Sequence, residues 1–243
     1  MINTLSIILP VFNEEKRLLE NLKKIKKFIS YKKIKKKEFI LVDDGSKDFS
    51  KRIIQNFIKK NSKKNEIRLI SYKKNQGKGA ALKRGVLAAK NNWILTSDID
   101  FSVSLFQLNT WINKNLIKFK KNSEVYFGSR ANYKSDVESK IYRKFIGFVL
   151  SKLIFYLLKI KTKDTQCGFK LYKKKVAKRV FAKMKSKGFE HDIEIAILLK
   201  KNNIKIVELP VKWVHKEFSK VNVIKDSIRI FKSIFYFRKI YLI

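Results

Sequence analysis

Residues 38–46 carry the clearest sign of the chain's architecture: Glu38-Phe39-Ile40-Leu41-Val42-Asp43-Asp44-Gly45-Ser46. The apolar run is typical of a buried strand, and two carboxylates and a glycine follow at its end. Similar apolar runs at 5–11, 67–71 and 93–97 alternate with amphipathic stretches at 14–29, 47–60 and 78–89. This alternation predicts an α/β fold, with a mostly parallel sheet flanked by helices.

Two later stretches have a different character. Residues 141–160 are apolar on most sides with a narrow polar stripe, and residues 223–243 read as a basic amphipathic helix. Both are predicted to be membrane-surface helices at the C-terminal side of a strand at 125–128. Burial of these helices against the sheet is the alternative.

Composition limits the partners. The 243 residues contain 58 Lys and Arg against 20 Asp and Glu, a formal charge of +38. The lysines are spread along almost every helix, without an RNA-binding aromatic signature or zinc-finger spacing, so we expect no nucleic-acid partner. An anionic membrane surface is the expected charged partner.

The chain has a single cysteine, Cys167, which excludes an internal disulfide framework and fits a reducing compartment. No window reaches the roughly 20 apolar residues that a membrane-spanning helix needs. We therefore expect a cytoplasmic protein that is peripheral on the cytoplasmic face of a membrane.

The strand ends carry the chemistry, because open α/β sheets bind ligands at the carboxyl ends of their strands. Pro10-Val11-Phe12-Asn13-Glu14 follows the first strand, and Asn13 could cap the next helix. A plain strand-to-helix turn would explain this motif equally well. At the end of the second strand, Asp43 could hydrogen-bond a nucleobase or a ribose.

Ser97-Asp98-Ile99-Asp100 ends the fourth strand. In an extended chain, residues i and i+2 point to one face, so Asp98 and Asp100 are predicted to hold one divalent cation. Mg²⁺ or Mn²⁺ would neutralise the charge that develops on a leaving nucleoside diphosphate. Asp-x-Asp alone is a weak signal that gains weight from the two earlier motifs.

The segment Asn75-Gln76-Gly77-Lys78-Gly79-Ala80 precedes a helix but lacks both the Walker spacing and the Gly-x-Gly-x-x-Gly pattern. These departures argue against a nucleotide triphosphatase and a dehydrogenase. Gly77 and Gly79 are predicted to let the helix start pack closely against the nucleotide-binding strands, and Lys78 to contact the nucleotide.

In the second half, Asp164-Thr165-Gln166-Cys167-Gly168-Phe169-Lys170 places a carboxylate, an amide, a glycine and a cation in one loop. Arg130 and Arg143 are the cations that we assign to a lipid phosphate, because an arginine fork can bind phosphate oxygens bidentately. Asp192 or Glu194 could order Lys170 or Gln166, or polarise an acceptor. His191 and His215 lack companions for a metal site.

Together these motifs resemble glycosyltransferase family 2, the inverting enzymes with the Rossmann-like GT-A fold, and most of all the branch of dolichyl-phosphate β-glucosyltransferases. The similarity runs from Ser6 to Lys220 and is most specific in residues 164–170, with support from 208–213 and 219–220. It implies a single domain over 1–243, with a nucleotide-sugar half at 1–130 and an acceptor and membrane half at 131–243.

The motifs and the resemblance together give expected roles for individual residues. Asp100 and Asp192 are the expected catalytic residues, and Asp98 and Asp100 the metal ligands. The acceptor phosphate is expected at Arg130, Arg143, Gln166 and Lys170. The nucleotide sugar is expected at Pro10, Phe12, Asn13, Glu14, Asp43, Asp44, Lys78, Asp98 and Lys220.

The implied reaction is an inverting, metal-dependent transfer of a hexose, glucose from UDP-glucose, to a polyprenyl or dolichyl phosphate. Such a phosphate is already anionic, so it can attack the anomeric carbon without a strong base. A polyprenyl-phosphate mannosyltransferase using GDP-mannose, or a cell-envelope polysaccharide glycosyltransferase with a hydroxyl acceptor, remains an alternative. A basic binding module with a degenerate catalytic fold is the alternative from another class.

Overall fold

The structure is a computed structural model that describes residues 2–31, 33–61, 66–117, 124–138, 141–216 and 223–241. For the helix starts at 141–145 and 223–226 it describes the backbone alone.

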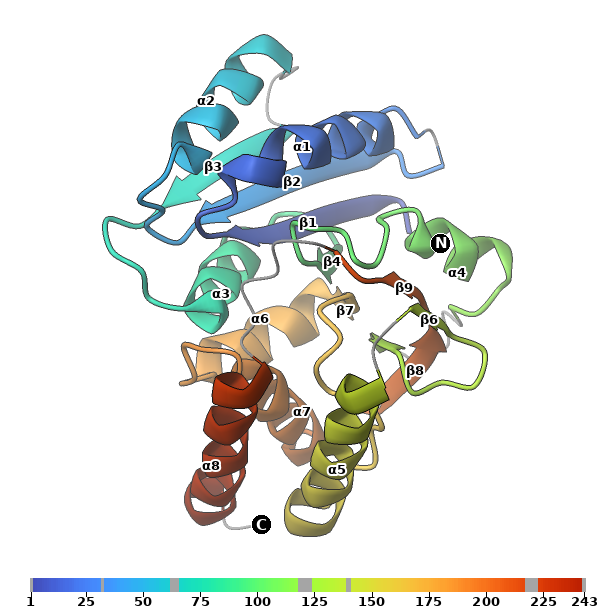
Figure 1. The fold of residues 1–243 in the computed structure, drawn as a ribbon. Coiled ribbons are helices and arrows are strands. Elements are labelled where there is room, and N and C mark those ends of the chain that lie inside the picture. Colours follow the sequence, from blue (N-terminus) through green and yellow to red (C-terminus); the bar gives the residue numbers. More distant parts are fainter. Residues whose placement is uncertain are drawn as a thin grey trace.

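Seven strands form one central sheet in the order β3-β2-β1-β4-β7-β5-β8 (Figure 1). Neighbouring strands are parallel except at β7, which runs antiparallel to both β4 and β5. The predicted α/β fold with a mostly parallel sheet is therefore confirmed, and one reversed strand joins its two parts. The strands are β1 (Thr4–Val11), β2 (Lys36–Asp43), β3 (Ile67–Ser71), β4 (Trp93–Thr96), β5 (Val125–Ser129), β7 (Lys170–Lys173) and β8 (Ile206–Pro210). A separate parallel pair joins β6 (Asp136–Glu138) to β9 (Lys212–Val214).

Helices cover both faces of the sheet because successive residues of each buried strand point to opposite sides. Ile7 and Leu9 of β1 pack with helices α1 (Glu15–Ile29), α2 (Ser50–Asn61) and α4 (Gln107–Asn113). Ile8, between them, packs on the other side with α3 (Lys78–Ala88), α6 (Lys174–Lys183) and α7 (His191–Lys201). Burial on both faces explains why the strands read as continuous apolar runs.

A third apolar cluster joins α7 to the two helices that were predicted to lie on a membrane, α5 (Ile141–Leu158) and α8 (Val223–Tyr241). Ile154 and Leu158 of α5, and Ile230 and Ile234 of α8, are buried there. Each helix also keeps large apolar side chains exposed, so burial accounts for only one side of it. The two helices lie at the opposite end of the molecule from α1 and α2 (Figure 1). Among the described residues, no helix is long and apolar enough to cross a membrane.

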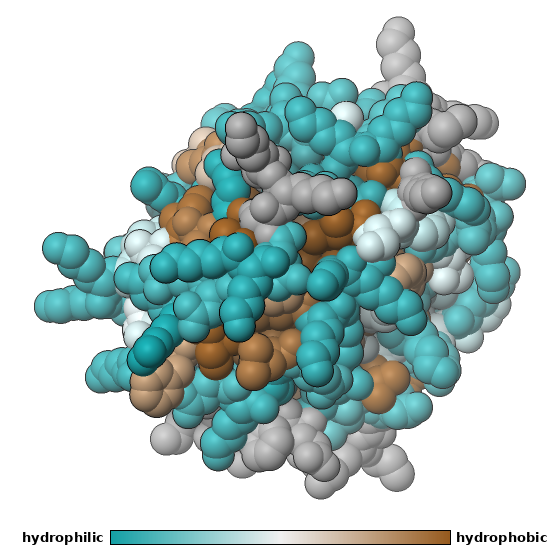
Figure 2. Space-filling view, turned by 90° about the horizontal axis from the view of Figure 1, so that it is seen from above, coloured by the Kyte–Doolittle hydropathy of each residue, from teal (hydrophilic) through white to brown (hydrophobic). Residues whose placement is uncertain are grey.

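Hydrophilic side chains are distributed over the surface (Figure 2), as the even spread of lysines along the sequence predicts. Figure 2 shows the face seen from above, where long hydrophilic side chains project in every direction and apolar surface shows between them. Hydrophilic side chains are therefore distributed over this whole face.

Gly85 sets the distance between α3 and the sheet. A Cβ atom at this position would lie 2.3 Å from Ile8 Cγ2 and 3.0 Å from Val42 Cγ2. Both neighbours are fully buried, β-branched side chains on central strands, so neither can turn aside easily.

We expect Gly85→Ala to destabilise the protein by about 1–3 kcal/mol, because overpacking outweighs the better helix propensity of alanine. Gly147→Ala in α5 is the matched control, since its added Cβ would meet nothing within 4 Å. That variant should be stabilised by up to about 1 kcal/mol. Urea unfolding measures both values, and equal effects would contradict the tight packing of α3.

Candidate active site

The carboxyl ends of four strands meet at one edge of the sheet. The register pairs Val11 of β1 with Asp43 of β2, and Asp43 with Ser71 of β3, while β4 lies on the other side of β1. The three N-terminal motifs therefore lie together, as their positions after the strands predict.

The loop after β1 is tied to the loop after β2. Asn13 has a positive φ of 52°, donates its backbone N–H to Ser46 Oγ at 3.0 Å and accepts from the Lys47 N–H at 2.8 Å. The expected helix cap at Asn13 is wrong: Glu14 is the N-cap residue of α1 and makes no side-chain cap. Asn13 is engaged by the neighbouring loop instead. Pro10 and Phe12 are half-buried beside it.

The two acids after β2 have different surroundings. Asp43 accepts hydrogen bonds from the Ser46 N–H at 3.2 Å and the Ser71 hydroxyl at 2.8 Å. Asp44 accepts from the backbone N–H groups of Gln76 and Gly77 and from the Asn75 amide. Burial raises the pKa of Asp44, against the opposing effect of these backbone hydrogen bonds. Asp44 therefore holds the loop that leads into α3.

Asp98 and Asp100 lie in a turn and not on an extended strand. Strand β4 ends at Thr96, and the Phe101 N–H donates to the Asp98 carbonyl at 3.2 Å. The prediction that Asp98 and Asp100 share one face of an extended strand is therefore wrong. The chain turns at these residues, and Phe101, which follows them, has a φ of 50°.

Each carboxylate of this turn has a cationic partner. Lys78 Nζ lies 2.6 Å from Asp98 Oδ1, and Arg17 Nη1 lies 3.7 Å from Asp100 Oδ2. Arg17 also donates through two nitrogens to the Glu14 carboxylate. Glu14, which was predicted to line the nucleotide pocket, is thereby linked to the predicted metal motif through Arg17.

A small polar cavity opens beside Asp98. Arg130 and Gln166, predicted to bind the acceptor phosphate, line the same cavity as Asp98. The Gln166 Nε2 atom is buried and has no hydrogen-bond partner among the described residues. The cavity therefore presents a guanidinium and an unpaired amide donor next to a carboxylate. Its other lining residues are Ser97, Ser102, Val103, Cys167, Gly168, Phe169 and Trp213.

Asp164 fixes Arg130 in this position. The Arg130 backbone N–H, Nε and Nη2 donate to its two carboxylate oxygens at 2.8–2.9 Å. Burial opposes the charge on Asp164, but Arg130 outweighs that effect and holds the pKa of the carboxyl below its usual range. The Asp164 N–H in turn donates to Glu208 Oε1 of β8 at 3.1 Å.

Lys170 and Asp192, which are not among the residues that line the cavity, form a buried ion pair. Lys170 is 1% exposed, and its ammonium contacts Asp192 Oδ1 and stands 4.9 Å from the centre of the Phe127 ring. Burial opposes ionisation of Asp192, yet His191, Lys170 and Lys78 outweigh it and lower its pKa. Of the alternatives considered for Asp192 and Glu194, the structure shows the pairing of Asp192 with Lys170. The Lys170 ammonium points to Asp192 and not into the cavity. In this conformation Lys170 could not contact a phosphate bound in the cavity.

The side chains of two expected substrate-binding residues are not described. Arg143 belongs to the first turn of α5, where the structure describes the backbone only, and Lys220 lies outside the described residues.

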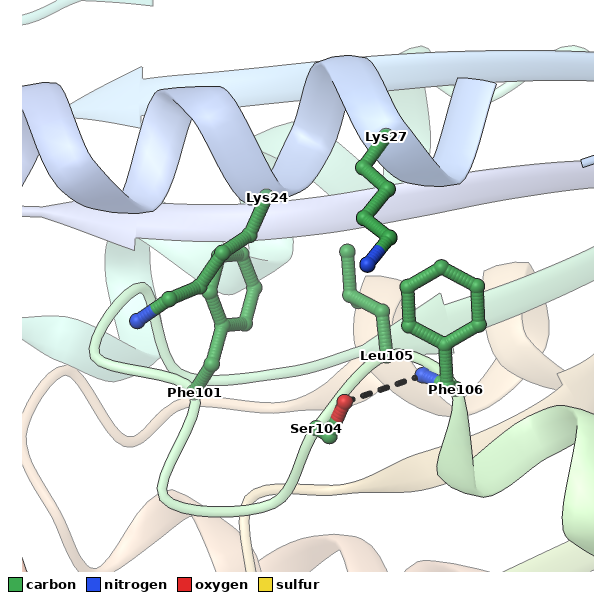
Figure 3. A pocket seen from close by; sticks show the side chains of 6 residues that line it. All are labelled: Lys24, Lys27, Phe101, Ser104, Leu105 and Phe106. Carbon is green, nitrogen blue, oxygen red and sulfur yellow. Dashed lines mark hydrogen bonds between the residues drawn. The ribbon is translucent and has the colours of Figure 1, made fainter. Parts of the chain in front are cut away.

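A second, larger cavity of about 250 Å³ lies between α1 and the loop after Asp100 (Figure 3). Phe101, Leu105 and Phe106 provide apolar lining, with Lys24 and Lys27 above them. It contains none of the predicted site residues, so the polar cavity is the better candidate for the chemistry.

The residues at the turn fit a hard divalent cation. Asp98 and Asp100 offer carboxylate oxygens, and the described residues contain no group of three or more His, Cys, Asp or Glu that could hold a metal. Magnesium is commonly bound by one or two carboxylates together with substrate phosphates. Asp98 and Asp100 could therefore hold Mg²⁺ or Mn²⁺ jointly with a diphosphate.

Sequence reasoning missed Arg17 and the part played by Asp164. The spacing of Glu14 and Arg17 at i and i+3 on a helix was an available signal, because such residues are neighbours on one face. No local signal indicated that Asp164 would meet Arg130, which lies 34 residues earlier.

Comparisons with known proteins identify the family of this chain. The model of the family described as glycosyl transferase family 2 matches residues 6–181. A dolichyl-phosphate beta-glucosyltransferase of Dictyostelium discoideum is 35% identical over 98% of this chain and 75% of its own length. The human protein of the same name is 27% identical, over 98% of this chain and 76% of its own length.

Among solved structures, glucosyl-3-phosphoglycerate synthase from Mycobacterium tuberculosis, crystallised with Mn²⁺, UDP and glucosyl-3-phosphoglycerate, superposes with a TM-score of 0.64. It is 15% identical, and the match covers 94% of this chain and 77% of that one, which supports the GT-A fold alone. Sequence similarity over nearly the whole chain and the strand-end motifs together carry the assignment: the chain is a glycosyltransferase and belongs to glycosyltransferase family 2.

Proposed function

We propose that the protein transfers glucose from UDP-glucose to a dolichyl or other polyprenyl phosphate, with inversion and with the help of Mg²⁺ or Mn²⁺. One observation carries the proposal: a single polar cavity joins Asp98, on the donor side, to Arg130 and Gln166, on the acceptor side. The names of the similar proteins support the choice of glucose and of dolichyl phosphate.

The donor diphosphate would lie at the strand-end turn. Asp98 and Asp100 would hold the cation, which supplies charge neutralisation for the leaving nucleoside diphosphate. Lys78, at the start of α3 and paired with Asp98, would contact the same diphosphate. Asp43 keeps acceptor capacity for a base or a ribose, since each oxygen accepts one assigned hydrogen bond.

The acceptor phosphate would lie between Arg130 and Gln166. A guanidinium aligned by Asp164 and an unpaired amide N–H are donors suited to phosphate oxygens. Positioned this way, a phosphate oxygen can attack the anomeric carbon as the bond to the nucleoside diphosphate breaks.

The surroundings of Asp192 favour a phosphate acceptor over a hydroxyl. A general base works best when its pKa lies near the operating pH. The pKa of Asp192 is instead lowered, with burial outweighed by His191, Lys170 and Lys78, so its carboxylate is a weak base. A lipid phosphate needs no such base, whereas a sugar hydroxyl does.

The acceptor is a lipid, and α5 and α8 offer a surface on which to meet a membrane. Their exposed large side chains are Phe148, Val149, Phe155 and Tyr156 on α5, and Ile228, Phe231, Phe235 and Tyr236 on α8. Lys152 stands 5.3 Å from the Phe148 ring, and Arg229 and Lys232 are exposed on α8. Exposed aromatics with flanking cations are typical of helices that lie in the headgroup region.

The substrate assignment predicts a specific result in a donor panel. UDP-glucose, UDP-galactose, UDP-N-acetylglucosamine and GDP-mannose, each radiolabelled, are incubated with the protein, Mg²⁺ and a short polyprenyl phosphate. Label should enter the organic phase from UDP-glucose and depend on Mg²⁺. Transfer of label from GDP-mannose alone would show that the donor is not UDP-glucose. Transfer only to hydroxyl acceptors would overturn the assignment of a lipid phosphate as acceptor.

Arg130→Lys keeps the positive charge but loses the fork that Asp164 aligns. We expect the KM for polyprenyl phosphate to rise about 10- to 100-fold, the loss of a charged hydrogen bond, with the KM for the donor changed less than about twofold. Arg52→Lys, an exposed arginine of α2, is the control. A parallel rise in both KM values would show that Arg130 does not serve the acceptor.

The membrane surface predicts binding to vesicles that contain anionic lipid. Replacing Phe148 and Phe231 by serine should weaken binding at least about tenfold, because each aromatic loses its apolar burial. Phe49→Ser is the matched control, since Phe49 is 65% exposed but stands at the start of α2. If only the Phe49→Ser variant lost vesicle binding, the membrane-binding surface would lie near Phe49 and not on α5 and α8.

A further inference from the structure

Lys78 and Asp98 meet at the carboxylate that the proposed function assigns to the divalent cation. Lys78 Nζ lies 2.6 Å from Asp98 Oδ1, and the two side chains are 20% and 39% exposed. An ammonium and a metal ion cannot share this position without strong repulsion, because both carry positive charge.

The backbone around Lys78 is fixed from two sides. The Gly77 N–H donates to Asp44 at 2.8 Å, and the Ala80 N–H donates to the Lys187 carbonyl at 3.1 Å. Gly77 has a φ of 103°, and a Cβ there would lie 2.4 Å from the Lys187 oxygen. The start of α3 therefore cannot shift easily, and only the side chain of Lys78 is free to reorient.

Asp98 is confined as well. A Cβ on Gly168 would lie 2.4 Å from Asp98 Oδ2, so the loop backbone stands directly against this carboxylate. In this conformation one oxygen of Asp98 is on Lys78 and the other faces Gly168. A cation that is to use Oδ1 must therefore displace the ammonium.

The displaced ammonium would remain within the site. Burial disfavours its charge, but the carboxylates of Asp98, Asp192 and Asp100 together outweigh this effect and raise the pKa of Lys78. Its ammonium also stands 5.5 Å from the centre of the Phe189 ring. A diphosphate bound beside this charge would give it another anionic partner.

We propose that Lys78 is the counter-ion of Asp98 and competes with the divalent cation for it, so that donor binding frees the carboxylate for the metal. The inference rests on the proposed function for the identity of the donor. Because the coupling between two ligands is reciprocal, the cation would strengthen donor binding to the same degree. Lys78 would thereby favour loading of metal and donor together.

The test measures the binding of Mn²⁺ to the full chain by isothermal titration calorimetry. The titration is done first without nucleotide and then in the presence of UDP. Lys78→Gln should bind Mn²⁺ alone at least about tenfold more tightly than the unaltered protein, because the competing charge is gone. The gain in Mn²⁺ affinity caused by UDP should shrink in this variant. Lys78→Arg, which keeps the charge, should retain the weak binding of Mn²⁺ alone.

Lys173→Gln is the control for a change in net charge, because Lys173 pairs with Glu124, at 3.5 Å, and not with Asp98. Unfolding curves confirm that each variant is folded. Unchanged or weaker Mn²⁺ binding by folded Lys78→Gln would overturn the competition, even if glucose transfer is observed. Tighter Mn²⁺ binding by Lys78→Gln would support it even if the donor panel identified another sugar, so the two failures are distinguishable.

Discussion

The hydrogen bonds accepted by the Asp164 carboxylate hold together the residues that are proposed to bind the acceptor. It accepts three hydrogen bonds from Arg130 and one each from the backbone N–H groups of Gln166 and Cys167. This single buried group aligns the guanidinium and turns the loop so that Gly168 reaches Asp98. The residues proposed to bind the donor and the acceptor come from distant parts of the chain, and the hydrogen bonds of Asp164 bring them together.

The site as a whole is built from paired charges. Asp98, Asp164 and Asp192 each contact a lysine or arginine, and Arg17 stands between Glu14 and Asp100. Buried pairs contribute little net stability when intact, but removing one partner leaves an uncompensated charge at high cost. Their value here is geometric, because each pair holds one functional group at a defined place. The excess of positive charge on the surface is a separate feature.

Much of the fold could be predicted because the signals are local. The apolar runs before Asp43 and Asp98 are strands, and the strand ends gather the motifs as expected. The reversed strand β7 could not be predicted, because its sequence is short and Lys170 was assigned to a loop. The pairing of β7 with β4 buries Lys170, which then forms an ion pair with Asp192 of α7. The turn at Asp98 was missed for a similar reason: nothing in an Asp-x-Asp string shows that the strand ends at Thr96, before the first aspartate.

The same placement decides what kind of chemistry the site suits. Lys170 at the start of β7 and His191 at the start of α7 both face Asp192, so this acid stays ionised and paired inside the molecule. A carboxylate held in this way can position its neighbours but abstracts protons poorly. Catalysis must then come from alignment and charge neutralisation, which is sufficient when the acceptor is already an anion. The buried pair therefore connects the packing of the sheet core to the proposed use of a phosphate acceptor.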